Sequence, residues 1–218
     1  MADTTGITVA ERVQLVAAGS ADLLCHAPPF ALSAAALVEL ALLGRLGTAR
    51  NTAFFNGGAP VRLTVLDGTP TGNPVLDAAL APIAARRALR TPDKWIVDLW
   101  RVVPEAVVAE LTRRGIASAV VSLTVEEAAA SPGRTARLRV DDPWATTERR
   151  LVSEARAVPE GVTDPRLGAV IDVVDHFGEA FSPEFSARPF VPRQWYPEST
   201  RATIEQILRA EMLVTGNQ

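Results

Sequence analysis

The stretch FALSAAALVELALLGRLG, residues 30–47, is apolar over most of its length and carries two glycines near its end, Gly44 and Gly47. A helix built from this stretch presents apolar side chains on nearly every face. Such a helix is stable only where other elements surround it, so we expect it at the centre of the fold.

Helical patterns flank this central stretch along the chain. The clearest is DPRLGAVIDVVDHFGEAF, residues 164–181, where Asp164 is expected to cap a helix whose first turn contains Pro165. Apolar residues recur at helical spacing after them. Further helices are expected at residues 7–24 with a break around Gly19, and at 74–87, 91–103, 103–115, 148–157 and from Ser199 onward.

Two segments predict β-hairpins. In the first, a strand around Ala53–Phe55 and a return strand at Val61–Leu66 flank the turn formers at residues 56–58. In the second, residues 116–125 and 135–140 are the expected strands, with a long connection between them.

A short pattern recurs before each hairpin. Its two copies lie 71 residues apart and consist of Glu39, Leu40 and Gly44, then Glu110, Leu111 and Gly115. The chain therefore uses a helix followed by a hairpin twice. That order is also the outline of a winged helix, so a DNA-binding protein is one alternative. We expect a mainly α fold in which residues 7–218 form a single α-helical domain decorated with β-hairpins, after a disordered tail at residues 1–6.

Composition limits the classes of function. The 218 residues are 48% apolar and carry a net charge of -3, with a pI of about 5.5, so the basic footprint of a nucleic-acid binder is absent and no nucleic-acid partner is expected. Cys25 is the only cysteine, which fits a reducing cytoplasm. No stretch approaches the roughly 18 uninterrupted apolar residues of a membrane span. We expect a cytoplasmic protein that meets a membrane only as a peripheral protein, at the inner face of the cell membrane.

The loop DGTPTGNP, residues 67–74, permits two interpretations. Gly72 and free amides at a helix start could hold a phosphate. Against this, the loop contains no lysine or arginine, and two prolines remove amide donors. Asn73 is placed to cap a helix whose first residue is Pro74. We expect a structural corner.

The sequence offers little for catalysis or metal binding. Asp172, Asp175 and His176 share one helix, but the other histidine, His26, lies 150 residues away and a metal site needs three or four converging groups. No nucleophile motif, phosphate-binding loop or dinucleotide fingerprint occurs. We therefore expect a protein that is not an enzyme, with no catalytic residue, no metal and no cofactor.

One part of the chain concentrates positive charge, although charged helix faces are usually only solvated. The arginines concerned are Arg86, Arg87, Arg90, Arg101, Arg113 and Arg114.

Several motifs together resemble the Golgi phosphoprotein 3 family. They are LVELALLGRL (37–46), DGTPTGNPVLDAAL (67–80), DKWIVDLW (93–100), VVAELTRRGI (107–116) and DPRLGAVIDVVDHFGEAF (164–181), in the order and spacing of that family. The chain resembles its bacterial branch, found especially in actinobacteria. The resemblance implies a mainly α-helical single domain with hairpins, no catalytic activity, and a peripheral membrane adaptor; eukaryotic members bind phosphatidylinositol 4-phosphate and glycosyltransferase tails.

The resemblance also implies a lipid-headgroup site. The family builds it from one tryptophan and three arginines, whose positions fall here on Leu24, Ser33, Arg101 and Pro104. Only Arg101 keeps the family residue, so Arg101 is the expected headgroup-binding residue. Two classes of partner follow: anionic membrane lipid, or other proteins, including a second copy of the chain, that pair with the hairpins in a protein-interaction or oligomerisation module.

Overall fold

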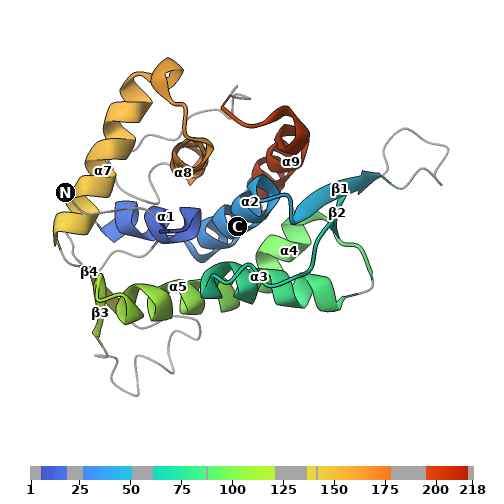
Figure 1. Cartoon of the computed structure of the whole chain (residues 1–218), viewed down its shortest axis with the longest axis horizontal. Coiled ribbons are helices and arrows are strands. Elements are labelled where there is room, and N and C mark those ends of the chain that lie inside the picture. Colours follow the sequence, from blue (N-terminus) through green and yellow to red (C-terminus); the bar gives the residue numbers. More distant parts are fainter. Residues whose placement is uncertain are drawn as a thin grey trace.

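One helix lies at the centre of the protein. The computed structural model describes residues 6–18, 27–50, 61–86, 88–120, 137–140, 142–177 and 195–215. Helix α2, Pro29–Leu42, has eleven of its 14 residues buried and contacts helices α1, α3, α4, α5, α8 and α9. The expectation of a central, all-round apolar helix is confirmed (Figure 1). Its many alanines let the neighbouring helices approach closely.

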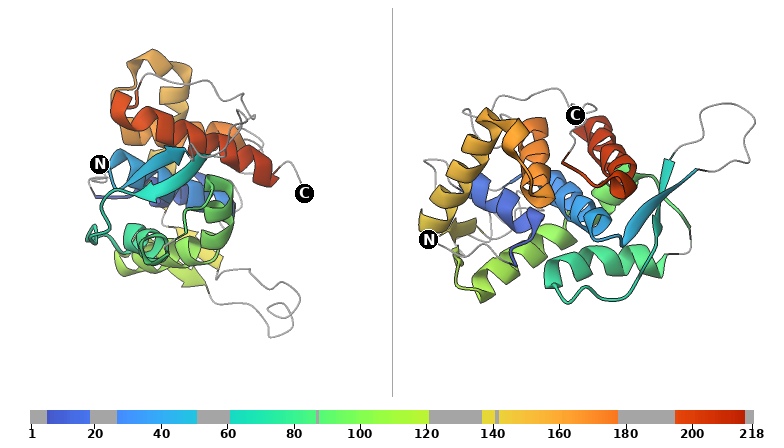
Figure 2. Two further views of the ribbon diagram at one scale, coloured as in Figure 1. Left: turned by 90° about the vertical axis from the view of Figure 1, so that its right-hand side faces the viewer. Right: turned by 45° about the horizontal axis from the view of Figure 1, so that its top comes forward.

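The surrounding helices form two groups about α2. Their bounds are α1 Val9–Ala18, α3 Pro74–Ala85, α4 Pro92–Leu99, α5 Val102–Arg113, α7 Asp142–Ala157, α8 Pro165–Phe177 and α9 Glu198–Thr215, with a short 3₁₀ helix at Pro159–Gly161. Helices α1, α7 and α8 pack together on one side, and α3 packs on α5 on the other (Figure 2). The mainly α fold class is confirmed. Within the described ranges, no helix is both long and apolar enough to cross a membrane.

Two helix starts differ from expectation. Helix α7 begins at Asp142, six residues before the expected start at Glu148, because Pro143 sits in the first turn, where its missing N–H costs no helical hydrogen bond. Helix α9 begins at Glu198, one residue before Ser199. The start of α8 is as predicted: Asp164 accepts the Arg166 N–H at 2.9 Å and Pro165 is the first helical residue.

Both hairpins are present, and the first strand of the first hairpin begins earlier in the chain than the expected strand. Strand β1, Leu46–Arg50, pairs antiparallel with β2, Val61–Val65. The chain enters β1 directly after α2 because the helix stops at Gly44, and the register sets Leu46 opposite Val65. The expected strand at Ala53–Phe55 lies outside the described residues. Strands β3, Ala117–Val120, and β4, Arg137–Val140, form the second hairpin as predicted.

The repeated pattern has the same structural role in both copies. Gly44 and Gly115 adopt φ of 68° and 67°, in the left-handed region that glycine enters without strain. In each copy the glycine N–H bonds to the carbonyl three residues earlier, and the next N–H bonds to the carbonyl five residues earlier. This is the Schellman motif, and it turns α2 into β1 and α5 into β3.

A buried carboxylate of α2 anchors the start of α1. Thr8 and Glu11 form a capping box, in which the Thr8 N–H donates to Glu11 Oε2 at 2.8 Å and the Glu11 N–H donates to Thr8 Oγ at 3.2 Å. The Val9 N–H, the next free amide, donates to Glu39 Oε2 at 2.6 Å. Glu39 is fully buried and also pairs with Arg166 at 2.9 Å. Two of the orphan amides of α1 are therefore satisfied by carboxylates.

Candidate functional site

The loop before α3 is a closed corner. Asn73 Oδ1 accepts the N–H groups of Val75 and Leu76 at 2.9 and 3.2 Å. The carboxylate of Asp77, one turn into α3, accepts the N–H groups of Thr71 and Gly72 at 2.6 and 3.2 Å. A phosphate held by this loop would have to accept hydrogen bonds from these amides. Each of them already donates to an acceptor within the loop or α3. The expected structural corner is confirmed.

The acidic residues of α8 serve packing. Asp172 accepts the Tyr196 O–H at 2.6 Å and the Trp195 Nε1–H at 3.3 Å, and Asp175 pairs with Arg156 at 2.6 Å. Burial lowers the pKa of His176. Among the described residues, no three His, Cys, Asp or Glu side chains come together as a metal site. Cys25 and His26 lie outside the described ranges.

Four of the arginines that cluster in the sequence are ion-paired in the fold. Two pairs each share one carboxylate: Arg86 and Arg90 share Asp98, and Arg113 and Arg114 share Glu110. The hydrogen bond from Arg113 and the neighbouring Arg114 lower the pKa of Glu110 to about 2. Helix α5 holds Arg101 and Arg113 about 18 Å apart along its axis. Arg101 and the pair Arg113 and Arg114 therefore lie at opposite ends of α5, and Arg87 lies outside the described residues.

Arg101 stands apart from these pairs. It is exposed at the start of α5, and its guanidinium carbon lies 4.7 Å from the centre of the Trp100 ring. No acidic side chain of the described residues lies within ion-pairing distance of it. The Trp100 ring in turn lies 6.2 Å from the Phe30 ring, centre to centre, with the planes tilted by 32°. Arg101 is thus an unneutralised cation supported by an aromatic pair.

Two exposed apolar residues flank this cation. Val97 and Val102 are 44% and 42% exposed. We call the surface formed by Val97, Trp100, Arg101 and Val102 the α4–α5 corner. It combines a positive charge, a half-buried aromatic ring and apolar side chains in one short segment.

The other positions implied by the resemblance contribute no charge. Ser33 is fully buried, and its O–H donates to the Pro29 carbonyl at 3.0 Å. Pro104 is buried in the first turn of α5, and Leu24 lies outside the described residues. The sequence pattern did not indicate Phe30 or Trp100 as site residues; the adjacent Trp-Arg dipeptide at a helix junction was the available signal.

The fold and this corner define a mainly α-helical protein with two hairpins and an exposed cation on an aromatic ring. The family model described as Golgi phosphoprotein 3 (GPP34) matches residues 10–209, and the chain belongs to the Golgi phosphoprotein 3 family. This is not an enzyme family. A comparison with curated proteins finds no match. Assignment to the bacterial branch stays a prediction.

Proposed function

We propose that the protein is a non-enzymatic peripheral membrane adaptor that binds anionic lipid headgroups at the α4–α5 corner. The observation that carries this proposal is Arg101, exposed on the Trp100 ring and without an acidic partner among the described residues. Membership of a lipid-binding adaptor family supports it.

The chemistry of the corner suits a membrane interface. A guanidinium offers several N–H donors in the geometry that a phosphate group accepts. A tryptophan places its ring at the level of the headgroups, and exposed valines add apolar contact. Each cation near an anionic surface contributes about 1 kcal/mol.

We expect weak selectivity among anionic headgroups. Ser33 and Pro104 occupy positions where the family site has arginines, and both are buried. With one guanidinium in place of three, recognition depends on charge more than on the stereochemistry of one phosphoinositide.

Sedimentation with vesicles tests the proposal. The protein is expected to bind vesicles that contain an anionic lipid at low salt, and Arg101→Ala is expected to weaken binding about fivefold, the factor that corresponds to one cation. Arg150→Ala is the matched control, because Arg150 is also exposed but already pairs with Glu154 at 3.0 Å. Absence of binding to anionic vesicles, or equal binding by Arg101→Ala, would contradict the proposal.

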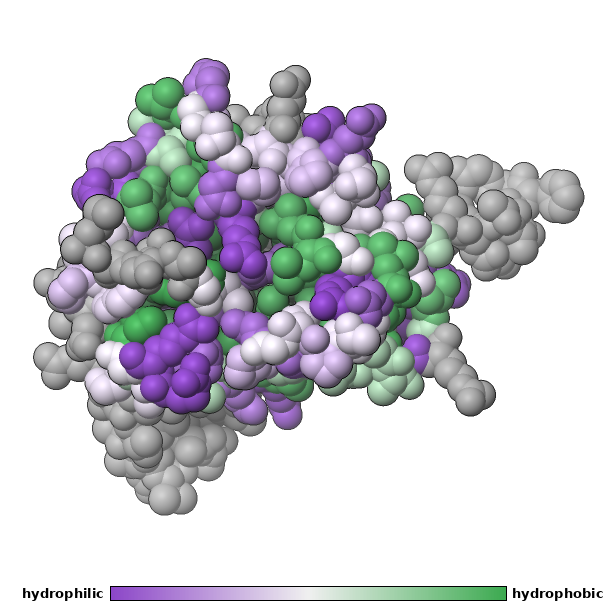
Figure 3. Space-filling model, in the orientation of Figure 1, coloured by the Kyte–Doolittle hydropathy of each residue, from purple (hydrophilic) through white to green (hydrophobic). Residues whose placement is uncertain are grey.

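A second candidate function is self-association, and one surface favours it. Apolar residues gather over α2 and the base of the first hairpin (Figure 3), where Leu43 and Leu66 are 44% and 63% exposed. Contiguous exposed apolar surface of this kind is typical of protein contacts. Light scattering across a concentration series tests it: a dimer that Leu66→Glu converts to monomer supports the candidate, whereas a wild-type monomer throughout excludes it.

A further inference from the structure

Helix α3 is apolar on nearly every side, yet one of its faces is open to solvent. Its 12 residues, PVLDAALAPIAA, include a single charged side chain, Asp77, whose carboxylate accepts hydrogen bonds from the loop before the helix. The inner face is buried against the rest of the protein. The outer face contains Ala81, Pro82, Ala84 and Ala85, which are all exposed. A helix of this composition is normally covered on every side.

Helix α7 shows the usual composition of a helix face that meets water. Its exposed positions include Arg150, Ser153 and Glu154, which are charged or polar. Side chains of this kind keep one face of a helix solvated. The four exposed residues on the outer face of α3 include no such side chain, so this face has the composition of a contact surface.

An open groove joins the outer face of α3 to the α4–α5 corner. The apolar part of its lining comes from Pro82 and Ala85 of α3, Leu99 of α4 and Val102 of α5. Val102 also belongs to the α4–α5 corner, where it is 42% exposed. The outer face of α3 and the corner therefore adjoin and can contact the same partner.

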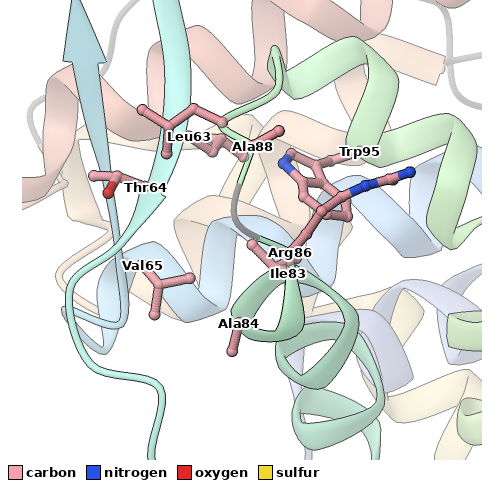
Figure 4. Close-up of a pocket in the computed structure, with 9 residues that line it drawn as sticks. Leu63, Thr64, Val65, Ile83, Ala84, Arg86, Ala88 and Trp95 are labelled. Atoms are coloured by element: carbon pink, nitrogen blue, oxygen red, sulfur yellow. The ribbon is translucent and has the colours of Figure 1, made fainter.

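The charge beside the groove is positive. Arg86, which lines the groove, and Arg90 share the single carboxylate of Asp98, so one positive charge remains in excess there, in addition to Arg101. In Figure 4 the Arg86 side chain runs from the end of α3 past the Trp95 ring, and its guanidinium carbon lies 5.8 Å from the centre of that ring. An arginine placed in this way covers apolar surface with its stem and keeps its charge in water.

From these features we infer that the outer face of α3 lies on an anionic membrane together with the α4–α5 corner. Its alanines and Pro82 then contact the boundary between the headgroups and the acyl chains. The inference rests on the lipid binding proposed for the corner and names a further element that the lipid covers. The excess positive charge favours an anionic surface. It disfavours a second copy of the chain, because two such faces would bring like charges together.

A fluorescent label on α3 tests the contact. The full chain carries Cys25→Ser, which removes the only native cysteine, and Ala81→Cys, which is labelled with nitrobenzoxadiazole. On binding to vesicles of phosphatidylcholine and phosphatidylglycerol, the emission of the label is expected to shift to shorter wavelength. Nitroxide groups on the upper part of the acyl chains are expected to quench it. The matched control is Ala157→Cys, because Ala157 is an exposed alanine of α7, on the other side of α2, and its label is expected to stay in water.

A substitution that adds apolar area gives a second measurement. Ala81→Leu is expected to strengthen sedimentation with the same vesicles roughly fivefold, because the lipid removes the larger side chain from water. The variant should remain folded, since position 81 is exposed and leucine has a high helix propensity. Ala157→Leu is expected to leave vesicle binding unchanged.

The outcomes separate this inference from the proposed function. If the protein binds the vesicles through Arg101 but the label at position 81 stays in water, or if Ala81→Leu binds no more tightly than the wild type, the inference is overturned and the proposed function stands. If the wild type does not bind these vesicles, both are overturned. A shift of the label with protein concentration in the absence of vesicles would show that a second copy covers α3, which also overturns the inference.

Discussion

Gly168 lies where α8 passes closest to Trp195. A Cβ atom at Gly168 would stand 2.7 Å from Cγ and Cδ1 of the Trp195 ring. The ring cannot move aside easily, because its Nε1–H donates to the buried Asp172. Gly168→Ala is therefore expected to lower the free energy of unfolding by about 1–3 kcal/mol, despite the helix preference of alanine. Urea denaturation measures the change.

Gly161 provides the control for that substitution. A Cβ atom there would meet its nearest neighbour, Val158, at 3.9 Å. Gly161→Ala is expected to change stability by no more than about 0.5 kcal/mol. If both variants lose the same stability, close packing against Trp195 is not the cause.

Glu110 links stability to pH. Its pKa is about 2 in the folded protein, against 4.5 as the ordinary value, because Arg113 and Arg114 bind the carboxylate. Folding therefore favours the ionised form. The stabilisation is fully present above pH 4.5 and is lost as the pH falls toward 2. The stability difference between the wild type and Glu110→Gln is expected to shrink over that range, as measured by denaturation at several pH values; a constant difference would contradict this.

The accessible charge of Arg101 could not be deduced from the sequence. Six arginines stand close together along the chain, and their order does not show which of them have acidic partners. Arg86 and Arg90 share the one carboxylate of Asp98, which lies on α4. Such pairing depends on how α3 and α4 pack, and the order of residues does not reveal it.

At the scale of elements, the two copies of the helix–hairpin unit both hold the start of α1. Glu39 of the first copy accepts the Val9 N–H at 2.6 Å. In the second copy, Glu110 binds Arg114, whose guanidinium donates to the Gly6 carbonyl at 2.9 Å. Each repeated glutamate therefore ties its own helix to the N-terminal segment, directly in the first copy and through Arg114 in the second.

Removal of the Glu39 carboxylate should destabilise the start of α1, whose Val9 N–H donates to it. Glu39→Ala removes the acceptor of the Val9 amide and leaves a cavity beside Arg166. We therefore expect this substitution to lower the free energy of unfolding by about 2–4 kcal/mol. Glu39→Gln keeps an acceptor for the Val9 amide, so it should lower the free energy of unfolding less than Glu39→Ala does. Chemical denaturation gives the stability, and hydrogen exchange of the α1 amides gives the location. Glu154→Ala, an exposed position on α7, should change stability by no more than about 0.5 kcal/mol.

Element prediction succeeded where a local signal marks the boundary. Helices α3, α4 and α8 begin at prolines, and the Asn73 cap of α3 is visible in the sequence because its hydrogen bonds are local. Strand β1 at Leu46–Arg50 was not predicted, because its position depends on pairing with β2, whose partner residues lie 11 to 19 positions away. Pairing of that range is not encoded in the propensity of a short segment.

At the scale of the whole molecule, the candidate site is assembled by α2. Phe30 lies in the first turn of α2 and supports Trp100, 70 residues later, at the junction of α4 and α5. The sequence predicted the central helix from its apolar faces. It could not predict this contact, because the packing angle between α2 and α4 decides which aromatic rings meet.

The net charge of the protein determines how it can approach a membrane. At -3 the whole chain is repelled by an anionic surface, so we expect the proposed lipid binding to need the α4–α5 corner to face the lipid. Val97→Asp combined with Val102→Asp is expected to weaken binding to anionic vesicles roughly tenfold or more, because two negative charges enter that contact. Val158→Asp is the control, since Val158 is 62% exposed and lies outside the corner. Vesicle sedimentation at two salt concentrations measures all three proteins, and an equal loss in both variants would show that the approach is not oriented by the corner.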